Sequence, residues 1–191
     1  MKNRKLLFLV GAMLVVGVLL GIFISSEFNR PRETAGPVAT PSPSGLDASQ
    51  KIAPLKALVA QEPENRGAWV DLGNAYYDSG QPMEAVKAYG EALKLDPNDP
   101  NVLTDQGVMY RRLGMYQRAA DNFAQAHRVD PTHAQSLYNL GVVYRYDLKD
   151  LAKAREAWKK FLALQPVGPQ ADHVRGELKQ MQALSGGFQG K

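Results

Sequence analysis

The pattern of apolar and polar residues divides this chain of 191 residues into three zones. Residues 6–24 form an uninterrupted apolar run, whereas residues 31–45 are mostly Pro, Ser, Thr and Gly and offer no apolar face. Further along, apolar residues recur at helical spacing and are separated by single Gly and Pro residues. This pattern predicts one long apolar helix, then a segment without regular structure, then a series of amphipathic helices.

The amphipathic zone repeats itself with a period of 34 residues. The first series is Trp69, Leu72, Gly73, Tyr76, Gly80, Ala85, Tyr89, Ala92 and Pro97, and the second is Leu103, Gln106, Gly107, Tyr110, Gly114, Ala119, Phe123, Ala126 and Pro131. The third contains Leu137, Leu140, Gly141 and Tyr144, and then slips by one residue to Ala154, Trp158 and Pro166. The period and residue types resemble the tetratricopeptide repeat, a helix–turn–helix unit, from Arg66 to Pro166.

The repeated residues predict how the two helices of a unit pack. Gly73, Gly107 and Gly141 are expected where the first helix presses against the second, because a larger side chain there would hold the two backbones apart. Gly80 and Gly114 suit the left-handed position that ends a helix. The corresponding turn of the third unit, residues 147–150, lacks glycine and holds one extra residue, so we expect it to be longer.

We therefore predict an all-α fold, a tetratricopeptide-repeat solenoid of helix–turn–helix units. Three repeats are expected at residues 66–99, 100–133 and 134–167. A lone N-terminal capping helix within residues 51–65 and a C-terminal capping helix at residues 168–184 would cover the apolar ends of the stack, as solenoids require. Pro54 would suit the first turn of the N-terminal helix. Residues 185–191 are expected to form a frayed tail.

Residues 1–24 predict a basic N-terminus followed by a transmembrane anchor at residues 6–24. A helix of this length measures about 28 Å, close to the thickness of the hydrocarbon core. A cleaved secretory signal is the alternative, but the apolar run is long and is followed by no small-x-small site. Residues 25–50 are predicted to be a flexible linker.

The charges that flank the apolar run favour one orientation. Lys2, Arg4 and Lys5 precede the run, and Arg30 and Arg32 follow it. This bias favours a cytoplasmic N-terminus and a periplasmic repeat domain, as in a single-pass protein of a bacterial inner membrane. A repeat protein that faces the cytosol, similar to mitochondrial receptors, remains an alternative.

Two glycines raise the question of self-association within the membrane. Gly17 and Gly21 have the G-x-x-x-G spacing that lets two helices approach closely, which predicts a possible homodimer. Glycine is also common in membrane helices generally, so the spacing has a second explanation.

Net charge does not favour a nucleic-acid partner. The chain carries +4 overall, of which residues 1–45 contribute +3 and the remaining residues only +1. The positive charge therefore flanks the apolar run instead of forming a basic patch on the folded part. The chain contains no Cys, which excludes disulfides and thiol catalysis.

The sequence offers no catalytic or metal-binding motif. No two of the residues His127, His133 and His173 have the i, i+4 spacing that places two ligands on one helical face. Glycines occur singly and not in a phosphate-binding loop, and no Ser stands in a G-x-S-x-G context. We predict no enzymatic activity, no cofactor and no metal.

The resemblance implies where a partner would bind. In the family, first helices line a concave groove, with contacts at set positions of each unit. Carried over to this chain, these positions are Val70, Asn74, Tyr77, Asp78, Asn101, Thr104, Val108, Arg111, Arg112, Gln135, Tyr138, Val142, Arg145 and Tyr146. Aromatic and arginine side chains are frequent at protein-contact hot spots. The peptide-carboxylate clamp of chaperone-binding members is not predicted, because Val70 and Gln135 replace its basic residues.

The predicted function is therefore that of a membrane-anchored module that recruits or holds a protein or peptide partner, in envelope protein assembly or secretion. A self-associating membrane organiser without a client is the alternative. Residues 46–99 carry a net charge of −4 and residues 100–191 carry +5. This asymmetry suggests that the basic half could orient an acidic partner segment.

Overall fold

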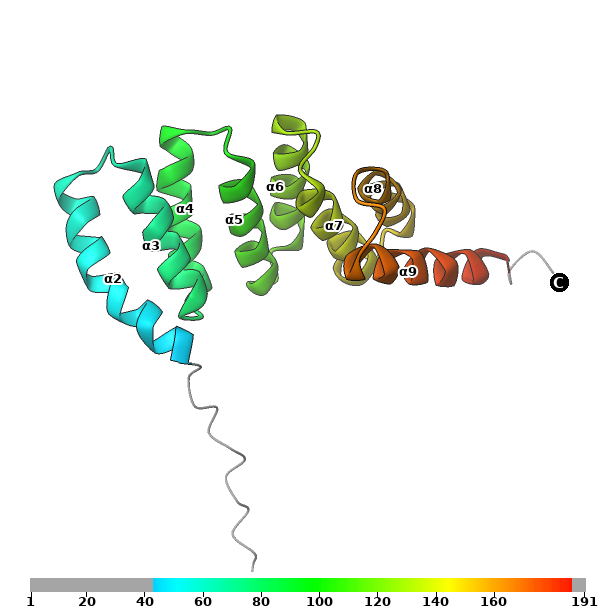
Figure 1. The fold of residues 1–191 in the computed structure, drawn as a ribbon, viewed down its shortest axis with the longest axis horizontal. Helices are drawn as coiled ribbons and strands as arrows, with labels where there is room; N and C mark the ends of the chain where they lie inside the picture. The colour runs from blue at the N-terminus through cyan, green and yellow to red at the C-terminus, as the bar shows by residue number, and fades with distance from the viewer. Residues whose placement is uncertain (1–42, 187–191) are drawn as a thin grey trace, which may run out of the picture. The chain divides into compact units, whose positions relative to one another are not determined.

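The computed structural model describes residues 43–186, and the side chains of residues 48–183. The elements are α2 (Pro43–Gln61), α3 (Arg66–Asp78), α4 (Pro82–Leu95), α5 (Pro100–Arg112), α6 (Tyr116–Val129), α7 (Ala134–Val142), the π-helix η1 (Val143–Asp147), α8 (Leu151–Leu164) and α9 (Pro169–Gly186). Figure 1 shows them stacked in chain order, with α2 at one end and α9 at the other. The predicted all-α solenoid of helical pairs is confirmed for this part of the chain.

The predicted membrane anchor at residues 6–24 lies outside the described residues, as do Gly17 and Gly21. Among residues 43–186, no helix combines the length and the apolar character needed to cross a bilayer.

The helices begin where the sequence supplies a cap or a proline. The Asn65 side chain accepts a hydrogen bond from the backbone N–H of Ala68 at the start of α3. Asp99 caps α5 in the same way, and Asp150 caps α8. Because these side chains satisfy N–H groups that have no partner within the helix, each one fixes a helix start.

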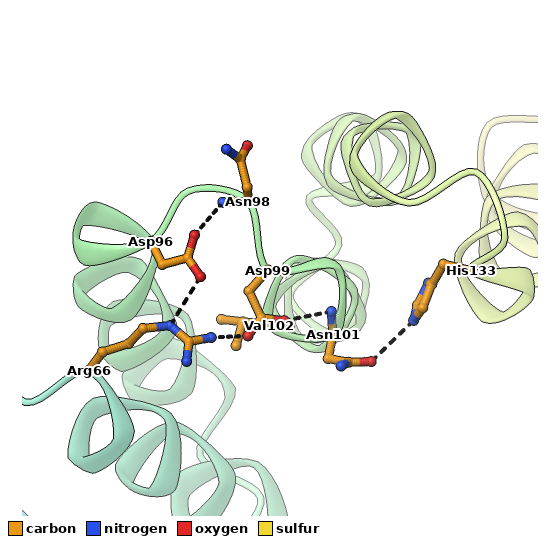
Figure 2. Close-up of polar contacts among 7 residues, drawn as sticks. All are labelled: Arg66, Asp96, Asn98, Asp99, Asn101, Val102 and His133. Carbon is orange, nitrogen blue, oxygen red and sulfur yellow. Dashed lines mark hydrogen bonds and ion pairs between the residues drawn. The ribbon is translucent and has the colours of Figure 1, made fainter.

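A polar network joins the edges of consecutive units (Figure 2). Arg66, the first residue of α3, forms ion pairs with Asp96 and Asp99, which lie on either side of the turn before α5. The side-chain oxygen of Asn101 lies 3.2 Å from Nε2 of His133, the residue before α7. These contacts tie α3 to α5, and α5 to α7, at the ends of the first helices.

The repeated glycines set the distance between the helices of each unit, as predicted. A Cβ atom on Gly73 would lie 2.5 Å from the Tyr89 ring, and one on Gly107 would lie 2.7 Å from the Phe123 ring. On Gly141 it would lie closer still to the indole of Trp158. The facing alanines of the second helices are fully buried: Ala85, Ala119 and Ala154.

Gln106 departs from the repeat and forms a buried polar link in place of an apolar contact. Its side-chain N–H₂ donates to the backbone carbonyl of Val86 in α4 at 3.0 Å. Its oxygen accepts from the Asn122 side chain in α6 at 2.7 Å. A buried amide is tolerated when its donor and acceptor are both satisfied, so Gln106 joins two second helices through α5.

The N-terminal capping helix differs from the prediction. Helix α2 starts at Pro43, so residues 43–50 are helical and do not belong to the linker predicted to end at residue 50. Pro54 therefore lies in the helix interior and not in its first turn. Interior proline removes one backbone hydrogen bond. Burial of Ala48 before it and Val59 after it compensates, because both are removed from water and Val59 packs into the core of the first unit.

The third unit accommodates its extra residue through the π-helix. Gly80 and Gly114 have positive φ angles of 73° and 74°, which confirms their predicted left-handed conformation. In the third turn Lys149 adopts φ 59° and takes the same role without being a glycine. The extra residue is taken up at the end of the first helix, which widens there into the single π-helical turn η1.

Candidate partner-binding surface

The predicted groove positions join neighbouring helices through matched side chains. The guanidinium of Arg112 in α5 stacks over the Tyr77 ring of α3 at 4.5 Å. Arg111 pairs with Asp147 in η1, with Nε and Oδ2 at 2.5 Å. The last joint pairs Arg145 of η1 with Glu177 of α9 at 2.9 Å. In each case an arginine at the twelfth or thirteenth position of a unit contacts an adjacent helix.

A hollow of about 490 Å³ lies between the second and third units; we call it the α5–α7 hollow. It is lined by Val108, Arg111, Arg112, Tyr116, Phe123, Asn139, Val142 and Asp147. Val108, Arg111, Arg112 and Val142 were predicted, and the structure brings them together. The hollow combines apolar walls with the donors of Arg112 and the amide of Asn139.

Four lining residues were not among the predicted site residues. Asn139 directly follows the predicted Tyr138 on α7, and Asp147 is the last residue of η1. Tyr116 and Phe123 come from α6, the second helix. The repeat positions assign only first helices to the groove, so nothing in that pattern indicates these α6 side chains.

A second hollow of about 700 Å³ lies between α2 and α3; we call it the α2–α3 hollow. It is lined by Ala48, Lys51, Pro54, Leu55, Leu58, Asp71, Asn74, Ala75 and Asp78. Two predicted residues, Asn74 and Asp78, lie here and not beside the basic residues of the other hollow. Asn74 also accepts a hydrogen bond from the buried Tyr89 hydroxyl at 2.8 Å.

Several other predicted residues are used within the fold. Thr104 is only 5 % exposed, and its hydroxyl donates to the backbone carbonyl of Pro100. Val70 and Tyr77 pack against the first-unit core, while Asn101 is exposed at the edge and contacts His133. A groove position is therefore no guarantee of an accessible side chain.

Helix α9 engages the groove positions of the third unit. Gln170 donates to Gln135, and the Tyr138 ring lies 6.1 Å from the ring of His173. Tyr138 also packs against Phe161, at 5.5 Å between ring centroids. The predicted surface formed by Gln135, Tyr138, Arg145 and Tyr146 is accordingly occupied in part by the chain itself.

Glu177 is the anchor of α9 on the third unit. Burial would raise the pKa of Glu177, but hydrogen bonds from Tyr146 and Arg145 outweigh it and lower the pKa below its ordinary value. Burial, with Glu177 beside it, raises the pKa of Tyr146 to about 12. The carboxylate and the two groove residues thus form one charge-assisted network.

The ion pairs change the predicted charge of the groove. Asp147 neutralises Arg111, and Glu177 neutralises Arg145. Of the three arginines among the predicted groove residues, Arg112 is therefore the one that has no carboxylate partner within the described residues. In the acidic half, Asp71 and Asp78 form no ion pair with any described residue. Burial, together with the nearby Asp78, raises the pKa of the Asp105 carboxyl.

The three histidines have separate surroundings. His133 contacts Asn101, and His173 contacts the rings of Tyr138 and Trp158. Burial lowers the pKa of His127. Within residues 43–186, no group of three or more His, Asp or Glu side chains is placed to hold a metal ion.

Comparisons with known proteins agree on the fold. Two family profiles, described as TPR repeat and tetratricopeptide repeat, match residues 73–114 and 104–169. A crystal structure of MamA is similar at 26 % identity and a TM-score of 0.61, over 63 % of this chain and 70 % of that one. No curated protein matches the sequence at a significant level.

Two further solved structures are tetratricopeptide-repeat domains. The Arabidopsis OM64 TPR domain is 22 % identical with a TM-score of 0.58, over 61 % of this chain and 96 % of that one. The first TPR of Spaghetti (RPAP3), bound to an HSP90 peptide, is 24 % identical with a TM-score of 0.57, over 63 % and 93 %.

Proposed function

Because the chain belongs to the tetratricopeptide-repeat family, we propose that this protein–protein interaction module is membrane-anchored and holds a polypeptide partner in the α5–α7 hollow. The observation that carries the proposal is the composition of that hollow. Val108 and Val142 can cover apolar side chains of a partner, whereas Arg112 and Asn139 can hydrogen-bond to its backbone or carboxylates.

Arg112 is the residue best suited to hold the partner. Its guanidinium has five N–H donors, and one of them donates to the carbonyl of Tyr77 at 3.4 Å. Stacking on Tyr77 fixes its orientation, so little side-chain entropy is lost when further donors bind a carbonyl or carboxylate. The peptide-bound Spaghetti domain provides support by analogy, since there the same fold binds a short peptide.

The test is affinity capture of the full-length protein from its native membrane, followed by mass spectrometry. We compare the wild type with Arg112→Glu and with Arg128→Glu, a control substitution at an exposed arginine of α6. The expected result is that Arg112→Glu loses a partner that Arg128→Glu retains. Identical partners for all three proteins would overturn the assignment of this hollow.

The partners that Arg112→Glu loses also distinguish between two functions. One partner in fixed ratio indicates a scaffold for a membrane complex, whereas many unfolded or secreted chains indicate a holdase. Arg145 and Tyr138 are unsuitable for this experiment, although they occupy groove positions. They contact α9 and α8, so their replacement would disturb the fold.

Membrane anchoring rests on the apolar run at residues 6–24. We propose that this run holds the repeat domain at a bacterial inner membrane, on the periplasmic side, where it takes part in envelope protein assembly or secretion. Alkaline washing of membranes should leave the full-length protein in the pellet and release a variant that lacks residues 6–24. Protease added to spheroplasts should digest the repeats; protection from protease would place them in the cytoplasm.

A further inference from the structure

Every second helix after α2 is covered by the first helix of its own unit. In α4 the covered positions are Ala85, Ala88, Tyr89 and Ala92, whose exposure is 3 % or less. The corresponding apolar residues of α6 and α8 are likewise buried: Ala119, Phe123 and Ala126 in α6, and Ala154, Ala157, Trp158 and Phe161 in α8. These positions mark the place where a first helix lies.

Helix α2 has the register of a second helix, but no helix precedes it within the described residues. One repeat before the covered positions of α4 stand Lys51, Pro54, Leu55 and Leu58. All four line the α2–α3 hollow instead of a closed core, and Leu55 and Leu58 remain partly exposed. The hollow of about 700 Å³ therefore lies where the first helix of an additional unit would pack.

The adjoining sequence of this chain does not favour that helix. Residues 32–42, which stand one repeat before residues 66–76 of α3, contain Pro37 and Pro41 and a single branched apolar residue, Val38. A single valine cannot supply the apolar stripe that packing on α2 requires.

Two of the three other joints pair a cation of the preceding element with a carboxylate of the following one, and they indicate which charge such a helix would carry. Asp147 corresponds to Asp78 once the extra residue of the third unit is counted, and it pairs with Arg111 of the preceding first helix. At the last joint the cation Arg145 likewise pairs with the carboxylate of Glu177. Asp78 has the same place relative to the α2–α3 hollow, but the described residues supply no preceding first helix to bring a cation to it.

The remaining charges of the hollow agree with a cationic occupant. Its lining carries two carboxylates, Asp71 and Asp78, against the single ammonium of Lys51.

We propose that the α2–α3 hollow is the docking site for a helix of a partner protein. The helix is amphipathic: its apolar stripe packs on Leu55 and Leu58, and an Arg or Lys near its C-terminal end pairs with Asp78. This inference does not depend on the α5–α7 hollow, and the two sites can be tested separately.

The probe is a synthetic, fluorescently labelled peptide with the sequence of residues 99–113. This segment is an amphipathic helix with an arginine near its C-terminal end. In the second unit it packs on a second helix, and its Arg111 pairs with the carboxylate of Asp147. Binding to the full-length protein is measured by fluorescence anisotropy. A peptide that carries the substitution Arg111→Glu serves as the matched, charge-reversed control.

The decisive measurement is a charge exchange at Asp78. Asp78→Asn should weaken binding of the unsubstituted peptide about fivefold, the effect of one partly exposed ion pair. Asp78→Arg should weaken it further and restore binding of the charge-reversed peptide. Asp121→Asn, which changes an exposed carboxylate of α6, should leave binding unchanged.

Crosslinking from a single introduced cysteine shows where the peptide binds. The chain has no cysteine, so Lys51→Cys provides a unique site for a photo-crosslinker at the wall of the hollow. The bound peptide should crosslink to it. Absence of binding, failure of the charge exchange to restore it, or binding without crosslinking would each overturn the proposal.

The thiol also tests whether the chain itself occupies the hollow. In the proposed state, the Lys51→Cys variant without peptide reacts rapidly with a maleimide. Slow labelling that does not change on dilution would assign the hollow to the chain's own N-terminal segment. Slow labelling that is relieved by dilution would assign it to a second copy. Either result would overturn the partner helix, without affecting the function proposed for the α5–α7 hollow.

Discussion

At the scale of single residues, the absence of one Cβ atom sets the contact between the two helices of each unit. The glycines at this position were identified from the sequence because they recur with the period of the repeat. The structure adds the distance that an added Cβ atom would have from the facing ring, and this distance is shortest at Gly141, opposite Trp158. Trp158 is fully buried and donates its indole N–H to the carbonyl of Tyr138 at 3.2 Å, so its ring cannot move freely.

Gly141→Ala should therefore destabilise the protein more than Gly107→Ala. Overpacking of this kind costs about 1–3 kcal/mol, from which the better helix propensity of alanine recovers about 1 kcal/mol. Thermal unfolding followed by circular dichroism measures the difference. Gly176→Ala is the control, since a Cβ at this position of α9 meets nothing within 4 Å and should raise the melting temperature. Equal effects at positions 141 and 176 would contradict the packing argument.

Asp105 is a residue whose charge opposes folding. Because its pKa is raised in the folded state, the folded protein binds a proton more readily than the unfolded chain does. The penalty is therefore absent below the ordinary pKa of 3.8 and complete once the pH exceeds the raised value. Asp105→Asn should increase the free energy of unfolding at pH 7 by about 0.5–1 kcal/mol and change little at about pH 3. Urea denaturation at both pH values measures this, and a destabilised variant at neutral pH would show that the carboxylate is compensated.

The candidate site was predicted only in part at this scale. Val108, Arg111, Arg112 and Val142 meet in one hollow because they share repeat positions on adjacent first helices. Which groove residues are already engaged depends on contacts between units, and the period of 34 residues contains no information on these. The pairing of Arg145 with Glu177 is such a contact, because Glu177 lies beyond the repeats.

At the scale of elements, most helices were predictable from apolar spacing, but the start of α2 and the π-helix η1 were not. Proline and composition suggested a linker up to residue 50, yet the buried face of α2 extends back to Ala48 and maintains the helix through Pro54. The extra residue of the third unit was visible as a slip in the repeat. Its location within the first helix, as η1, depends on which turn tolerates the insertion, and the sequence does not specify this.

The turn after η1 supplies a prediction at this scale. Lys149 holds φ 59°, a conformation that is unfavourable for residues with a Cβ and natural for glycine. Lys149→Gly should raise the free energy of unfolding by about 0.5–1 kcal/mol. Lys149→Ala removes the same side chain but keeps the strain, so it should not stabilise. Chemical denaturation compares the two variants, and the argument fails if alanine and glycine have the same effect.

At the scale of the whole solenoid, each unit contacts its neighbours along the stack and little else. In such an architecture stability is close to a sum of unit and interface terms. A change at one end should thus loosen that end first, as local opening, before the remaining units unfold. This separates the two candidate surfaces: α2 and α3 lie at one end, and α9 covers the third unit at the other end.

A substitution in the Arg145–Glu177 pair tests whether the two ends of the solenoid open independently. Because hydrogen bonds lower the pKa of Glu177, its carboxylate stabilises α9 above the ordinary pKa of 4.5, and the contribution is lost as the pH falls through the lowered folded value. Glu177→Gln at neutral pH should cost about 1 kcal/mol and speed hydrogen exchange in α9 and η1, while α3 and α4 keep their protection. Once the pH is well below the folded pKa of Glu177, the variant and wild type should exchange alike. Faster exchange throughout α3 and α4 at neutral pH would mean that the solenoid opens as one unit, and that a partner at one end would influence the other.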